Sequence, residues 1–82
     1  PVHEDIIGVQ TASGKPVAFQ RSKAIVALKN GEEITFENVR LQLEAGGIKA
    51  VDADGADLGS HQAFWFAWSQ FHPQTALWSG QS

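Results

Sequence analysis

The sequence predicts an α+β fold: a small, mostly antiparallel twisted sheet packed against one aromatic-rich helix, with room for a second short helix near residue 24. Several short segments alternate apolar and polar residues between Gly-containing turns, which is typical of half-buried strands. One segment near the C-terminus carries aromatic residues at helical spacing. The chain has 82 residues, of which 43% are hydrophobic and 18% charged, and this composition suits one small globular domain.

The chain opens with a predicted pair of strands. Residues 6–11 form the first strand, Ser13 and Gly14 form the turn, and residues 16–20 form the return strand. Pro16 suits either an edge strand or the opening position of a strand, because proline cannot donate a hydrogen bond to the ladder.

Residues 21–29 predict a short helix, with Ser22 as its N-cap and the Asn30-Gly31 pair as its left-handed stop. The β-branched pair at positions 25–26 also suits a strand, so both alternatives stay open. The apolar residues that would share the buried face of this helix are Ala24, Ile25 and Leu28.

The middle of the chain predicts three more strands. Residues 33–37 and 39–44 alternate strictly, but the inward positions are even in the first segment and odd in the second. We therefore expect a bulge or bend near Asn38 that absorbs one residue. A third strand follows at 48–52, and a turn follows at 54–55.

Four aromatic residues occupy the five positions 64–68. As a helix over 62–71, the segment places most of them on one wide apolar face, and Pro73 ends the helix. Burying four aromatic side chains would contribute on the order of 6–12 kcal/mol, which favours a core helix. Phe66 is the misfit, because it lies within the polar strip.

Charge and composition exclude several functions. The formal net charge is −3 and the six basic residues are scattered, so the sequence predicts no nucleic-acid binding. There is no cysteine, which excludes disulfides, thiol nucleophiles and cysteine-based metal sites. No apolar run approaches the roughly 20 residues that cross a bilayer, so we expect no membrane insertion by this segment.

The polar residues offer no catalytic or metal site. His61 and His72 would lie about 16 Å apart on an unbroken helix, which is too far for one metal ion. Ser60 next to His61 has no orienting acid, and the acidic residues at 52–57 lack the ligand spacing of a calcium loop. The sequence therefore predicts no catalytic residue, no metal and no cofactor.

Phe66 and Trp78 are the interface candidates. All fifteen charged residues lie between Glu4 and Asp57, and none follows. Trp78 stands in this uncharged tail, and an aromatic residue on a polar face often marks an interface. The alternative is that a neighbouring loop or the tail itself covers Phe66; Trp78 folding back over Phe66 would bury both residues.

The residues FWFAW at 64–68 and FHPQT at 71–75 resemble the C-terminal signature of a large family of bacterial and archaeal proteins, often exported, known as a domain of unknown function. The opening IIGVQTASGKPVAF is similar to that family's first two strands. The middle departs from the pattern, since longer members carry a cysteine-containing segment there. The resemblance implies a fold, an exported or membrane-associated parent with an extracytoplasmic location, and no established activity.

Two functional hypotheses follow. The first is a non-enzymatic binding or interaction module of a larger exported or membrane-associated bacterial protein, whose partner is a second copy of this chain or another protein. The alternative is a small-molecule- or metal-binding domain, or a vestigial enzyme, with a pocket near His61, Trp65 and His72. In both, residues 1–82 form one small domain, expected to be a fragment or C-terminal domain of a longer chain.

Overall fold

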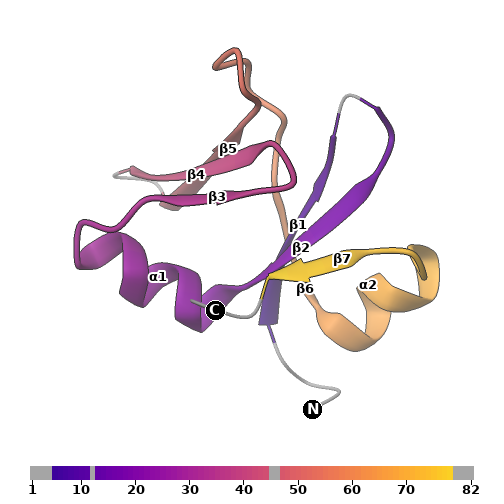
Figure 1. Cartoon of the computed structure of the whole chain (residues 1–82). Coiled ribbons are helices and arrows are strands. Elements are labelled where there is room, and N and C mark those ends of the chain that lie inside the picture. The colour runs from indigo at the N-terminus through magenta and orange to yellow at the C-terminus, as the bar shows by residue number, and fades with distance from the viewer. Residues whose placement is uncertain (1–4, 12, 45–46, 79–82) are drawn as a thin grey trace.

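The computed structural model describes residues 5–11, 13–44 and 47–78 and confirms the α+β class. Within these residues the strands form two sheets, mostly antiparallel, where the sequence predicted one (Figure 1). In chain order the elements are β1 (Asp5–Gln10), β2 (Pro16–Gln20), α1 (Arg21–Lys29), β3 (Ile34–Phe36), β4 (Val39–Glu44), β5 (Gly47–Val51), β6 (His61–Phe64), α2 (Trp65–Phe71) and β7 (Ala76–Trp78).

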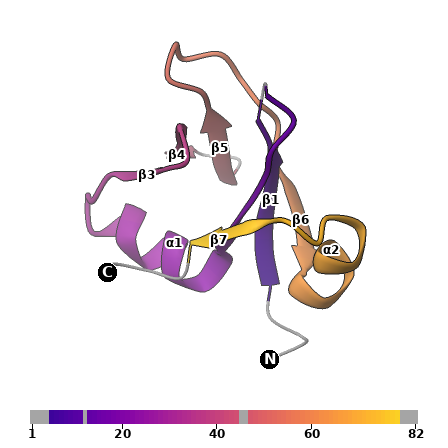
Figure 2. The same ribbon diagram turned by 45° about the vertical axis from the view of Figure 1, so that its right-hand side comes forward.

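The four-stranded sheet is the middle layer of the molecule. Its strand order is β6-β1-β2-β7, and the smaller sheet has the order β3-β4-β5. Figures 1 and 2 show α2 on one side of the four-stranded sheet, and α1 with the three-stranded sheet on the other. The two central strands, β1 and β2, are therefore covered on both faces.

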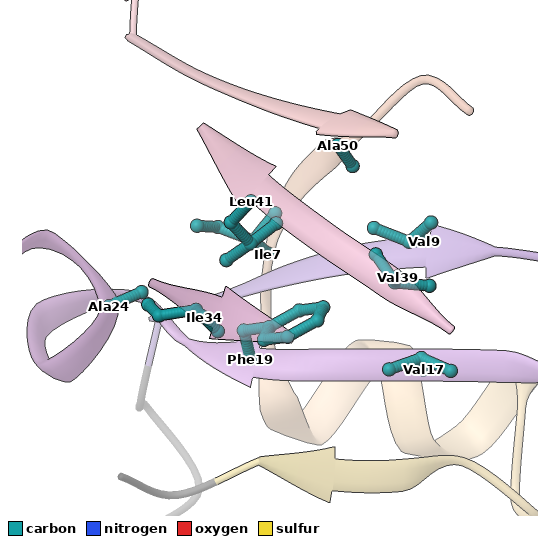
Figure 3. Close-up of a cluster of buried hydrophobic side chains, with 9 residues drawn as sticks. All are labelled: Ile7, Val9, Val17, Phe19, Ala24, Ile34, Val39, Leu41 and Ala50. Carbon is teal, nitrogen blue, oxygen red and sulfur yellow. The ribbon is translucent and has the colours of Figure 1, made fainter. Parts of the chain in front are cut away.

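Alternate residues of β1 and β2 belong to two separate clusters of buried hydrophobic side chains. Odd positions such as Ile7 and Phe19 face the three-stranded sheet and α1, whereas even positions such as Ile6 and Ala18 face α2. This accounts for the nearly continuous apolar sequence of β1, because a strand covered on both faces has no polar side. The larger cluster, drawn in Figure 3, consists of Ile7, Val9, Val17, Phe19, Ala24, Ile34, Val39, Leu41 and Ala50.

The C-terminal segment folds as a strand, a helix and a second strand that together span the four-stranded sheet. β6 pairs antiparallel with β1 at one edge, and β7 pairs parallel with β2 at the other edge. Because β1 and β2 are themselves antiparallel, β6 and β7 run in the same direction. The connection through α2 must therefore cross the face of the sheet. The sequence missed both strands, which it assigned to the helix and to a tail.

The β3–β4 connection is a tight two-residue hairpin, and it contains no bulge or bend that absorbs a residue, although the sequence predicted one near Asn38. Phe36 pairs directly with Val39, and the two residues between them, Glu37 and Asn38, have φ of 52° and 66°. Positive φ at both central positions is the requirement of a type I′ turn. Across a two-residue turn, an even position pairs with an odd one, so the change in parity needs no extra residue.

The predicted helix at 21–29 is confirmed, and the strand alternative at 25–26 is wrong. The helix follows β2 without a loop, and its N-cap is Gln20, which makes no side-chain capping hydrogen bond. Ser22 is therefore not the cap, because it lies inside the first turn. At the other end Gly31, with φ of 82°, takes the left-handed conformation that stops the helix.

An exposed ion pair joins the tips of two hairpins from different sheets. Lys15 Nζ lies 2.6 Å from Glu37 Oε1. An exposed pair of this kind contributes at most about 1 kcal/mol, so the packing of the two sheets depends on the buried cluster rather than on this contact.

Gly8 lets α2 sit directly on the sheet. A Cβ atom at this position would overlap three ring carbons of Trp68. Ala18, its neighbour across the β1–β2 pair, is also small and fully buried. The indole of Trp68 therefore lies on a flat platform that only small residues provide.

We expect Gly8→Ala to destabilise the protein by about 1–3 kcal/mol, because the added methyl group must displace the Trp68 ring. Urea unfolding, followed by far-UV circular dichroism, measures the change. Gln10→Ala, at an exposed position of the same strand, is the matched control and should stay within about 0.5 kcal/mol of the parent. Equal urea midpoints of unfolding for Gly8→Ala and the parent would contradict the close contact between Gly8 and Trp68.

Candidate functional site

α2 presents two distinct faces. The inward face carries Trp68, which is 7% exposed, and the half-buried residues Trp65 and Ser69. The outward face is a contiguous strip at positions i, i+1, i+4 and i+5, all of them exposed. We call this strip the outward face of α2; its residues are Phe66, Ala67, Gln70 and Phe71.

The prediction of a core helix that buries its whole wide apolar face is wrong, because Phe64 and Phe71 belong to that face and are exposed. Phe66 is 53% exposed and Phe71 is 81% exposed, and Phe64, at the end of β6, is 53% exposed. The helix begins at Trp65, three residues later than predicted, because residues 61–64 pair with β1. With only seven residues, α2 has one face to bury, and Trp68 is its buried side chain.

Thr75 ties the end of the helix to the buried indole. Trp68 Nε1 donates to Thr75 Oγ1 at 2.8 Å, and the Thr75 hydroxyl donates to the His72 carbonyl at 2.6 Å. The backbone N–H of Thr75 also donates to that carbonyl, at 3.1 Å. The His72 ring packs against the indole, with 4.2 Å between the ring centroids. The FHPQT stretch is thus a structural clasp around Trp68.

The three ligand candidates lie on the α2 side of the sheet. His72 contacts Trp68, and Trp65 packs against the second cluster. His61 is exposed at the start of β6, opposite Gly8. Among the described residues, no three histidine or carboxylate side chains come together as metal ligands.

Trp78, the second interface candidate, is a half-buried core residue of β7. It pairs with Phe19, and the two ring centroids are 6.0 Å apart. Because Phe19 faces the three-stranded sheet and α1, Trp78 lies on the face of the sheet opposite α2. It therefore does not cover Phe66, and the prediction that Trp78 folds back over Phe66 is wrong; the rest of the tail lies outside the described residues.

A groove of about 450 Å³ lies on the other face of the four-stranded sheet from α2. It is lined by residues of β1, α1, β4, β5 and the start of β6, and neither histidine nor Trp65 is among them. Sequence reasoning missed this groove, because its walls come from segments that are distant in the chain.

The acidic segment 52–57 uses a carboxylate to hold its own turn. Asp52 Oδ1 accepts from the backbone N–H groups of Asp54 and Ala56, each at 2.9 Å. Asp57 Oδ1 likewise accepts from the N–H of Gly59 at 2.8 Å. These are local turn interactions, in agreement with the prediction of a turn here.

No family model, no curated protein and no solved structure matches this chain. The resemblance of FWFAW and FHPQT to an exported family therefore stays a prediction. Of the two helices in the described part of the chain, neither is long and apolar enough to cross a membrane.

We expect Thr75→Val to destabilise the protein by about 1–3 kcal/mol, since the substitution leaves the buried Trp68 N–H without an acceptor. Thr75→Ser keeps the hydroxyl and should recover most of the loss. Thr35→Val, at an exposed position of β3, controls for the change from threonine to valine. Chemical denaturation of the three variants gives the comparison, and equal stability of Thr75→Val and Thr75→Ser would refute the clasp.

Proposed function

We propose that the protein is a non-enzymatic interaction module and that it binds through the outward face of α2. The observation that carries the proposal is the exposure of Phe66 and Phe71 on one helical face. Large aromatic side chains dominate the binding energy of protein interfaces, and contiguous apolar surface on a small protein marks a site of contact. Phe66, singled out from the sequence, belongs to this surface; Phe71 joins it, and Trp78 does not.

The partner that we propose for this face is a second copy of the chain. No charged residue occurs from Leu58 onward, so the face carries nothing that selects an oppositely charged partner. The net charge of −3 is confined to the preceding part of the chain. Two copies that meet through α2 keep their acidic surfaces apart, and a two-fold contact of one face with itself needs no other complementary surface.

The neighbouring strand supports the same mode of association. β6 forms the edge of the four-stranded sheet, and it contains neither a charged residue nor a proline. Proteins usually protect such edges with charge, proline or a covering element. The edge of β6 and the outward face of α2 are consecutive in the chain, so one contact can use both.

The polar groups nearby have structural partners, which supports a binding role over a catalytic one. The Ser60 hydroxyl donates to the Ile48 carbonyl at 3.3 Å, and the His72 ring contacts Trp68. The resemblance of the FWFAW stretch supports a further part of the proposal, namely that the module belongs to an exported or membrane-associated bacterial protein.

We expect the purified protein to associate reversibly, and we expect Phe66→Ser and Phe71→Ser each to weaken the association about five- to thirty-fold. Sedimentation over about a hundredfold range of protein concentration, chosen to extend on both sides of the dissociation constant, measures that constant. Val26→Ser is the matched control, because Val26 is 59% exposed but lies on α1.

Circular dichroism and urea unfolding of each variant establish that the fold is intact. A strict monomer over the whole concentration range would overturn self-association. Equal weakening by Val26→Ser would show that the contact does not lie at α2.

A further inference from the structure

The two sheets separate at one end and leave an inward-facing leucine uncovered. In β4, Val39, Leu41 and Leu43 share one face, and the first two are buried. Leu43 is 45% exposed although its position directs it toward the interior. It pairs with Ile48 of β5, and both residues line the groove of about 450 Å³. The core is thus closed at the Val39 end and open at the Leu43 end.

Apolar side chains from three further directions complete the floor of this groove. Ile7 of β1 contributes from the four-stranded sheet, Ile25 from α1 and Ile48 from β5. The volume falls within the range of roughly 300–1,000 Å³ that is typical of small-molecule sites. An aliphatic chain in this space would cover Leu43 and extend the core.

One stripe of α1 adds positive charge beside the apolar floor. Arg21, Ile25 and Lys29 are spaced by four residues, so they lie along one side of the helix, and all three line the groove. In the described part of the chain the ion pair is that of Lys15 with Glu37, so neither cation of the stripe is neutralised by an acid. The groove therefore carries positive charge on a protein whose net charge is −3.

The remaining polar residues narrow the class of ligand. Gln62 lines the groove near the start of β6 and can donate a hydrogen bond to an oxygen atom, whereas the Ser60 hydroxyl already donates to the Ile48 carbonyl. Glu44 also lines it and would repel a second carboxylate. The combination of an apolar floor, two cations and a single acid fits a ligand with one negative charge and a hydrocarbon body.

We propose that this groove binds a small amphipathic monocarboxylate. The hydrocarbon chain lies on Ile7, Ile25 and Leu43, and the carboxylate accepts charge-assisted hydrogen bonds from Arg21, whose planar fork matches a carboxylate. Lys29 lies about 12 Å further along α1 and adds a longer-range attraction. The site is separate from the outward face of α2, since the four-stranded sheet lies between them.

The test compares three ligands of equal chain length. The ¹⁵N-labelled protein is titrated with octanoate, octanol and octylamine, and the backbone amide signals are followed by NMR. We expect octanoate to shift the signals of Ile25, Ile48 and their neighbours in a saturable way. Octanol should bind about tenfold more weakly, because it lacks the charge, and octylamine should not bind at the groove.

Charge variants on α1 then locate the head group. Arg21→Gln and Lys29→Gln are each expected to weaken octanoate binding, by about tenfold for Arg21→Gln. Lys23→Gln is the matched control, because Lys23 is exposed on the same helix and does not line the groove. Lys29 is exposed at the end of α1, so Lys29→Gln decides the question if Arg21→Gln does not fold.

Three outcomes would overturn the proposal. They are the absence of any shift at millimolar octanoate, equal affinity for octanol and octanoate, and shifts confined to α2. Equal weakening by Lys23→Gln would likewise show that only the overall charge of the protein matters. Because Phe66→Ser leaves the groove intact, octanoate binding by that variant separates this proposal from the one on self-association.

Discussion

The contact between the Trp68 indole and Gly8 is the constraint on which the C-terminal half of the fold depends. It allows a helix of seven residues to lie flat across a sheet, which a larger residue at position 8 would prevent. Thr75 then holds the indole N–H and turns the chain into β7, which closes the far edge of the sheet beside β2. The same contact decides which side of α2 is turned outward, and so it places Phe66 and Phe71 at the surface.

The sequence predicts those elements whose pattern is local. The alternation in β3 and β4, and the span of α1, can be read directly because each segment has one buried side. β6 and β7 could not be predicted in this way, because a short strand is defined by its partners, β1 and β2, which are more than forty residues away in the chain. The parity change near Asn38 was visible in the sequence, and its interpretation failed because a two-residue hairpin reverses parity by itself.

Among the candidate site residues, too, the sequence reveals those with a local signal and misses those that depend on distant parts of the chain. Phe66 was found because it broke the helical pattern, and its side chain is exposed; its role in binding stays a prediction. Phe71 was missed because it shares the apolar arc with Trp68 in the predicted helix. In the structure its side chain is nevertheless exposed. The groove near Arg21 could not be found from the sequence, since its residues extend from Ile7 to Gln62 and become neighbours only when the two sheets pack.

Ile7 and Gly8 are consecutive residues of β1, yet one lines the groove and the other supports Trp68. The groove and the Trp68 contact are thus separated by the thickness of a single β-strand, and the outward face of α2 lies beyond that contact, on the far side of the helix. Protein interiors are close-packed and resist compression. A shift of β1 toward one face of the sheet would therefore remove packing contacts at the other face. Substitutions in β1 are therefore constrained from both sides, because a larger side chain at one of its positions can be accommodated only at the expense of packing on the opposite face of the sheet.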